Sequence, residues 1–267
     1  MGEQLIIAGA HRSGTSVTAR LLDRAGLFLG YDLDPPSPSN PYGLFEDREI
    51  QRLHNAILLD NGSTWQVSRR FLPVINPTRW GQLRDLIERR ESEHELWGFK
   101  EPRTCLFLEI WKNILPRAKS LIVFRHFSDS AYSLERRAAN ELFAGVRDPA
   151  IHRRFWQEPD LALRIWLTHN EALLTFAERH PADVMAVSMQ TLRGGFPLVG
   201  QLNDRWGLGL DDLGFEEVFD EKVTSSRPGR PTLYDAGLAE RLERTMDELE
   251  ALERRTLHER SEVADAG

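Results

Sequence analysis

The chain has 267 residues, enough to bury a substantial core, and its 34 Lys+Arg against 41 Asp+Glu give a formal net charge of -7 at pH 7. This balance argues against a general nucleic-acid-binding protein, because duplex binding requires a basic face, but a local basic pocket remains possible. Cys105 is the only cysteine, which excludes an internal disulfide and a cysteine-based metal site.

The first residues and the apolar runs indicate the expected cellular compartment. The opening residues MGEQ lead directly into an apolar run, without the pattern of a secretory leader. The longest apolar runs are far too short to cross a bilayer. A lone cysteine suits a reducing compartment, so we expect a cytoplasmic protein without a membrane span.

Short apolar runs alternate with stretches of helical periodicity along the chain. Strands are predicted over residues 5–9, 96–99, 120–124 and 183–187. Helices are predicted over residues 14–25, 46–60, 79–93, 105–115, 128–143, 158–180 and, at the C-terminus, 235–260. The alternation predicts an α/β fold: a P-loop-type three-layer sandwich with a central, mainly parallel sheet flanked by helices. We expect one domain over residues 1–267, with ligands bound at the carboxyl ends of the strands.

The first predicted strand ends in the sequence GAHRSGTS at 9–16. A strand, a glycine turn and a helix start present several backbone N–H groups and the positive end of a helix dipole to one point, which suits a phosphate. Gly9 permits the turn, and Gly14 lets the backbone approach the anion. Thr15 stands where a nucleoside-triphosphate P-loop carries its lysine, so triphosphate chemistry is disfavoured.

A second anion site is predicted where the third strand ends. Arg125 ends the run SLIVFR, and Ser133 follows eight residues later inside the next predicted helix. A guanidinium makes charge-assisted, often bidentate bonds to phosphate, and a hydroxyl adds a neutral donor. A lysine, Lys100, follows the second strand in GFKEPRT at 98–104.

These segments together resemble the sulfotransferases that use 3′-phosphoadenosine 5′-phosphosulfate (PAPS), in particular a bacterial branch similar to carbohydrate sulfotransferases. The sequence RSGTS resembles the family's 5′-phosphosulfate loop, in which lysine or arginine stands at the position of Arg12. The pair Arg125 and Ser133 resembles its 3′-phosphate segment, and KEP at 100–102 resembles the lysine–x–proline segment of the carbohydrate branch. Gln190 stands where the family often has glutamate, which argues against an acidic role there.

The resemblance implies a role for each motif residue. The 5′-phosphate is expected on the loop residues, and the 3′-phosphate on the strand-end arginine and the helix serine. Arg12 and Lys100 are expected to stabilise charge on the bridging oxygen. Cofactor contacts are thus expected from Arg12, Ser13, Gly14, Thr15, Ser16, Arg125, Ser133 and, in a C-terminal basic loop, Arg227.

The acceptor hydroxyl needs a general base, for which three residues are candidates. Glu46 is favoured by its position in the family's pattern, and Asp47 beside it is the alternative. An acidic pair at a helix start is also explained by the helix dipole alone. His11 in the loop itself is the rival base.

The implied activity is metal-free transfer of a sulfonate from PAPS to a hydroxyl of a saccharide or small-molecule natural product, with 3′-phosphoadenosine 5′-phosphate (PAP) as the product. Residues 34–95, a proline-rich loop followed by helices, are expected to shape the acceptor pocket. No aspartate-rich or histidine-rich metal spacing lies near the motifs. Two alternatives stay open: a degenerate P-loop kinase or hydrolase, and a nucleotide-binding protein without activity.

Overall fold

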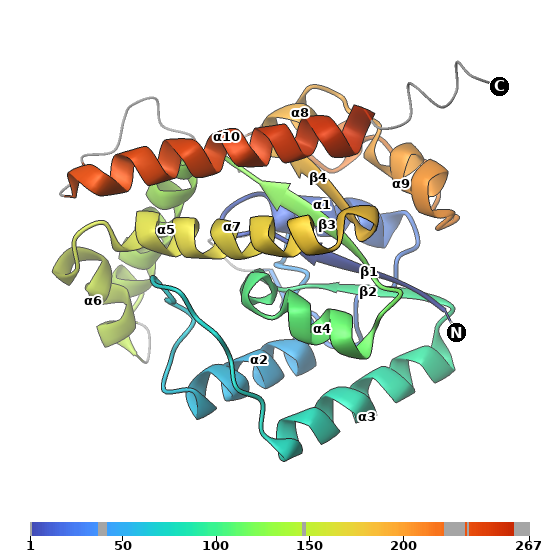
Figure 1. Cartoon of the computed structure of the whole chain (residues 1–267), viewed down its shortest axis with the longest axis horizontal. Coiled ribbons are helices and arrows are strands. Elements are labelled where there is room, and N and C mark those ends of the chain that lie inside the picture. The colour runs from blue at the N-terminus through green and yellow to red at the C-terminus, as the bar shows by residue number, and fades with distance from the viewer. Residues whose placement is uncertain (1, 37–41, 146–147, 222–232, 234, 259–267) are drawn as a thin grey trace.

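The computed structural model describes residues 2–36, 42–145, 148–221, 233 and 235–258 (Figure 1). Within these ranges the chain forms a four-stranded, all-parallel sheet with the strand order β2-β1-β3-β4. The strands are β1 (Glu3–Ala8), β2 (Leu96–Lys100), β3 (Lys119–Phe124) and β4 (Val184–Ser188). The predicted α/β fold and the predicted strands are confirmed.

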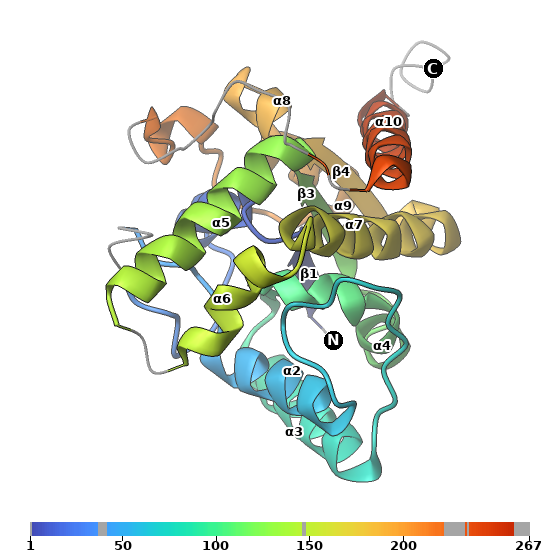
Figure 2. The ribbon, with the colours of Figure 1, turned by 90° about the vertical axis from the view of Figure 1, so that its left-hand side faces the viewer.

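The sheet separates two apolar cores, because successive side chains of a strand point to opposite faces. In β1, Ile6 and Ala8 belong to one core, whereas Leu5 and Ile7 belong to the other. The first core is covered by α2 (Arg48–Asp60), α3 (Pro77–Glu93), α4 (Leu108–Ile114), α5 (Phe127–Phe143), α6 (Pro149–Gln157), α7 (Leu161–Arg179) and α10 (Ala236–His258). The second core is covered by α1 (Thr15–Arg24), α8 (Met189–Arg193) and α9 (Leu198–Trp206). Figures 1 and 2 show these three layers, with α7 and α1 on opposite sides of the sheet.

Several predicted helix boundaries are corrected by local backbone chemistry. The helix predicted over 105–115 is a 3₁₀ helix (Pro102–Leu106) followed by α4. The helix predicted to begin at 46 begins at Arg48, because Asp47 is its N-cap and accepts a hydrogen bond from the Glu49 N–H at 2.8 Å. The helix predicted over 158–180 begins at Leu161, after Asp160 with its left-handed φ of 58°.

Among the α-helices of the described residues, α6, α8 and α9 lie outside the predicted ranges. The segment of α6 lacks a long periodic pattern, yet it begins with two local signals: Asp148, which accepts a hydrogen bond from the Ala150 N–H at 3.2 Å, and Pro149 at the first helical position.

The connections between strands place a ligand site. The chain leaves β1 toward β2 on one side and leaves β3 toward β4 on the other, although β1 and β3 are neighbours. Crevices of this kind, outside the carboxyl ends of strands whose connections diverge, are where open α/β sheets bind ligands. The sequences that follow β1 and β3 are the two predicted phosphate motifs. In the described ranges, every helix is too short or too polar to cross a membrane.

Candidate active site

The loop after β1 is a tight turn held by its own backbone. The Ser13 N–H donates to the Ala10 carbonyl at 3.2 Å, and Gly14 takes the left-handed conformation, with φ 96°, as the N-cap of α1. A Cβ at Gly9 would overlap the carbonyl oxygen of Val123, so the turn lies directly against β3. Gly9 therefore allows close packing of the loop against β3, and Gly14 supplies the left-handed conformation at which α1 begins; the approach of an anion to Gly14 stays a prediction.

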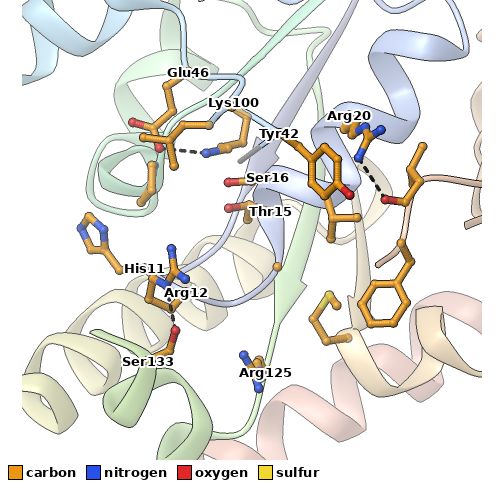
Figure 3. A pocket seen from close by; sticks show the side chains of 18 of the residues that line it. His11, Arg12, Thr15, Ser16, Arg20, Tyr42, Glu46, Lys100, Arg125 and Ser133 are labelled. Atoms are coloured by element: carbon orange, nitrogen blue, oxygen red, sulfur yellow. Dashed lines mark hydrogen bonds and ion pairs between the residues drawn. The ribbon is translucent and has the colours of Figure 1, made fainter. Parts of the chain in front are cut away.

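The first turn of α1 faces a cavity that also contains the second motif. Figure 3 shows the Thr15 and Ser16 hydroxyls directed into this cavity, with Arg125 and Ser133 on its far wall. The cavity is lined by His11, Arg12, Gly14, Thr15, Ser16, Val17, Arg20, Tyr42, Gly43, Leu44, Glu46, Lys100, Pro102, Arg125, Ser133, Arg137, Met189, Val218, Phe219 and Asp220. Ser13 does not line it, because its side chain is completely buried behind the loop. Arg227 lies outside the described residues.

A hydrogen bond joins the two predicted phosphate motifs. The Arg12 Nε donates to the Ser133 Oγ at 2.9 Å, across 121 positions of the sequence. Arg12 reaches this position from a left-handed backbone conformation with φ 67°. Arg125 is anchored one helical turn before Ser133 by an ion pair with Asp129 at 3.2 Å. The strand-end arginine, the helix serine and the loop arginine thus lie around one space.

This space is electropositive. Burial and the nearby cations Arg137, Arg125 and Arg136 lower the pKa of Arg12 from 12.5 to about 10, although Glu46 opposes the shift. Among the described residues, no carboxylate lies within ion-pair distance of Arg12. A partly buried cation surrounded by other cations is stabilised when an anion binds between them. The guanidinium groups, the hydroxyls and the N-terminus of α1 therefore fit a ligand with two separated anionic groups.

An ion pair lies at the opposite end of the cavity from Arg125 (Figure 3). The Lys100 Nζ donates to the Glu46 Oε1 at 2.8 Å, with the side chains only 1% and 8% exposed. The second carboxylate oxygen of Glu46 accepts a hydrogen bond from the Gln51 Nε2 at 3.1 Å. Both oxygens of the carboxylate are held, and the carboxylate borders the cavity.

Asp47, the alternative candidate for the base, points elsewhere. Its carboxylate caps α2 and forms a buried ion pair with Arg90 of α3. It does not line the cavity, so its geometry suits the helix-start role rather than catalysis.

His11 borders the cavity as a neutral ring. It contacts the ring of Trp65 edge-on at 4.9 Å and the ring of His169 at 5.5 Å. Burial, and then the positions of His169 and Arg103, lower the pKa of His11 well below its ordinary value. Its buried Nε2 has no hydrogen-bond partner among the described residues. A neutral imidazole at this position keeps His11 a rival for the base.

A buried polar network begins at Glu101, the residue that follows Lys100. The Glu101 carboxylate accepts from His54 Nδ1 at 2.6 Å and pairs with Arg103. The Trp111 Nε1 donates to His54 Nε2 at 2.9 Å, which fixes a neutral ring whose proton is on Nδ1. Arg103 therefore helps to hold the buried Glu101 carboxylate in place. The network attaches α2 to the end of β2, close to the ion pair of Glu46 and Lys100.

The remaining wall of the cavity combines Tyr42, from the loop expected to shape the acceptor pocket, with residues that the sequence did not identify. Tyr42 lies beneath the Arg20 guanidinium, 4.0 Å from the ring centroid, and its hydroxyl donates to Asp220 at 2.8 Å. Phe219 and Met189 add apolar surface beside them. These residues come from segments distant in sequence, and no spacing rule connects them.

One missed residue does have a signal in the sequence. Arg137 lines the cavity and follows Ser133 by four residues, one turn along the same face of α5. A search for cations at helical spacing from the predicted phosphate residues would have found it.

The comparisons with known proteins agree with this fold. No protein-family model matches the sequence, and no curated protein matches it. A sulfotransferase from Alicyclobacillus acidocaldarius has a similar structure, with a TM-score of 0.52 and 16% identity, covering 95% of this chain and 96% of that one. The sulfotransferase domain from the curacin biosynthetic pathway has a TM-score of 0.48 and 14% identity, covering 94% of this chain and 98% of that one. A mouse sulfotransferase complexed with PAP has a TM-score of 0.42 and 11% identity, covering 99% and 87% of the two chains. The predicted resemblance is confirmed at the level of architecture: the chain has the sulfotransferase fold.

Proposed function

We propose that this protein is a sulfotransferase that moves a sulfonate group from PAPS to the hydroxyl of a saccharide or small-molecule acceptor. The observation that carries the proposal is the hydrogen bond between Arg12 and Ser133 at the divergence of β1 and β3. It brings together two anion-binding motifs that lie far apart in the sequence. A ligand with one anionic group would leave one of the two sites unused.

The cation arrangement suggests how the ligand is oriented. The N–H groups at the start of α1, with Thr15 and Ser16, would hold the 5′-phosphate. Arg125 and Ser133 would hold the 3′-phosphate. The apolar wall formed by Met189 and Phe219 suits a flat base.

PAPS supplies an activated sulfonate on its 5′-phosphate. Glu46 would accept the proton of the acceptor hydroxyl as its oxygen bonds to sulfur and the bond from sulfur to the bridging oxygen breaks. Lys100 holds one carboxylate oxygen of Glu46 through the 2.8 Å ion pair, and Gln51 orients the second. Arg12 would stabilise the charge that develops on the bridging oxygen, which leaves as part of PAP.

The kinase or hydrolase alternative fits this site less well. Thr15 replaces the lysine that P-loop enzymes direct to the β and γ phosphates. The third strand is followed by Arg125 and His126, without the aspartate that would hold magnesium.

Thermal unfolding with a panel of nucleotides tests the proposal. A ligand that binds the native state at about 100 times its Kd adds about 2.7 kcal/mol to the unfolding free energy. We expect a large rise in Tm with PAP, a smaller rise with AMP, and none with ATP and magnesium. Arg125→Ala is expected to abolish most of the rise with PAP. Arg153→Ala removes an exposed arginine of α6 and serves as the matched control. A rise with ATP and magnesium alone would overturn the proposal.

Activity then requires an acceptor, which a panel of sugars, phenols and alcohols with labelled PAPS would identify. Binding of PAP without transfer to any acceptor would favour the alternative of a nucleotide-binding protein without activity.

A further inference from the structure

The cavity-facing side of α5 carries two ligand-binding candidates, only one of which belongs to the predicted motif. Ser133 and Arg137 are four residues apart, so they lie one above the other on the same face of the helix. Both line the cavity. Asp129, which forms an ion pair with Arg125 at 3.2 Å, lies one helical turn before Ser133, and Arg137 lies one turn after it.

Arg137 is not committed to a strong partner in the described part of the chain. Its ion pair there is with Glu141, one turn further along α5, at 3.9 Å. A partly exposed pair at the limit of ion-pair distance contributes little to stability. The side chain is 34% exposed, so it extends from the cavity to solvent.

The charges of the cavity indicate what Arg137 does there. Arg137 has the largest effect of any charge on the pKa of Arg12, larger than that of Arg125. Arg12, Arg125 and Arg137 line the same cavity, and their guanidinium groups repel one another unless an anion lies between them. A phosphate dianion near the Ser133 hydroxyl would satisfy all three.

We propose that Arg137 determines specificity for the 3′-phosphate: it binds that group from the side of Ser133 opposite Arg125, so that nucleotides lacking a 3′-phosphate are rejected. The inference rests on the proposed function, because it assumes a nucleotide in this cavity. The selectivity has two sources. A 3′-phosphate gains a second guanidinium, which can bind two of its oxygens at once. A 3′-phosphate also relieves the repulsion among the arginines, whereas a 3′-hydroxyl leaves it as it is in the free protein and gains nothing from it.

The chain offers a matched control. Arg136 precedes Arg137 in the same helix and has the same charge, but it is exposed and does not line the cavity. It also lowers the pKa of Arg12, though less than Arg137 does. Arg136→Gln therefore changes the long-range field without removing a ligand contact.

Isothermal titration of PAP and AMP into the wild type, Arg137→Gln and Arg136→Gln tests the inference. We expect Arg137→Gln to weaken PAP binding by about 10- to 100-fold, the range for a lost charge-assisted contact. AMP binding should change by less than about threefold, and Arg136→Gln should change neither ligand by more than about threefold. Arg137→Lys, which keeps the charge but loses the bidentate geometry, should be intermediate.

Other outcomes separate the two proposals. Equal losses for PAP and AMP in Arg137→Gln, or equal losses in Arg136→Gln and Arg137→Gln, would overturn the role of Arg137 while leaving the proposed function intact. A wild type that binds PAP no better than AMP would contradict the proposed function itself. Thermal unfolding of each variant without ligand shows whether it is folded. If Arg137→Gln does not fold, the loss of PAP binding in Arg137→Lys tests the role of Arg137 instead.

Discussion

Glu46 and Asp47 show how neighbouring acidic residues acquire different roles. The backbone turns into α2 at this point, so successive side chains point in different directions. Glu46 borders the cavity and pairs with Lys100, whereas Asp47 caps the helix and pairs with Arg90. The sequence favoured Glu46 as the general base and kept Asp47 as the alternative, because spacing alone does not show which carboxylate faces the ligand.

Glu46→Gln is expected to reduce the turnover of labelled PAPS with an accepted hydroxyl by about 10²- to 10⁴-fold, the usual contribution of a general base. The rise in Tm with PAP should remain, because Glu46 is assigned to the acceptor and not to the phosphates.

Asp47→Asn is the matched control for that measurement. It should leave the turnover of folded protein within a few-fold of the wild type. It should cost up to about 3–5 kcal/mol of unfolding free energy, because it leaves the buried Arg90 with only the more distant Glu49 carboxylate, at 3.6 Å. The opposite pattern, in which Asp47→Asn abolishes turnover and Glu46→Gln does not, would move the base to Asp47.

Among the structural elements, the loop before α1 and the start of this helix were predicted best from the sequence. The pattern of a strand, a glycine turn and a helix was sufficient to locate the loop, because the backbone conformation there depends on Gly14 itself. The 3₁₀ helix Pro102–Leu106 and α6 were missed because short segments are stabilised by tertiary packing and caps rather than by periodicity. The partners of Tyr42 on the cavity wall, Arg20 and Asp220, were missed for a related reason: these contacts are long-range.

Gly14→Ala and Gly26→Ala compare the two ends of α1. Both glycines have positive φ, 96° and 100°, but a Cβ at Gly14 would overlap the Met189 side chain, whereas a Cβ at Gly26 meets nothing within 4 Å. Gly26→Ala should cost about 1–2 kcal/mol for the left-handed backbone alone. Gly14→Ala should cost more in urea unfolding and should abolish the rise in Tm with PAP. Equal costs, with PAP binding retained in Gly14→Ala, would contradict the close packing assigned to the loop.

Helix α7 carries a titratable group in the core beneath the loop. His169 is fully buried, and its Nδ1 is bonded to the Ile165 carbonyl at 2.8 Å. Burial lowers its pKa to about 4. The ring is therefore neutral in the folded protein, but it takes up a proton near pH 6.5 when the chain unfolds. Its contribution to stability is complete above about pH 6.5 and is lost as the pH falls toward 4.

Urea unfolding at pH 7 and pH 5 checks this sign. The contribution of His169 to the unfolding free energy should fall by about 2 kcal/mol between pH 7 and pH 5. This follows because each pH unit below about pH 6.5 costs about 1.36 kcal/mol. His169→Gln cannot titrate, so its stability should fall by correspondingly less over the same interval. An identical decline in the wild type and in His169→Gln would show that His169 is not the group responsible.

At the scale of the whole molecule, an acidic protein has a cationic cavity. The formal net charge is -7, yet Arg12, Arg125, Arg137 and Lys100 converge where β1 and β3 diverge. Composition excluded a general nucleic-acid binder but did not reveal the cavity, because net charge averages over the surface. The alternation of strands and helices predicted the sheet, and the divergence of its connections explains why two distant motifs meet.

The central claim is that this cavity holds both ends of one doubly phosphorylated nucleotide, and a crystal structure of the PAP complex tests it most directly. We predict the 5′-phosphate at the backbone N–H groups that begin α1, and the 3′-phosphate within hydrogen-bond distance of Arg125 and Ser133. A complex in which PAP binds outside the cavity, or in which its 3′-phosphate contacts neither residue, would contradict the account.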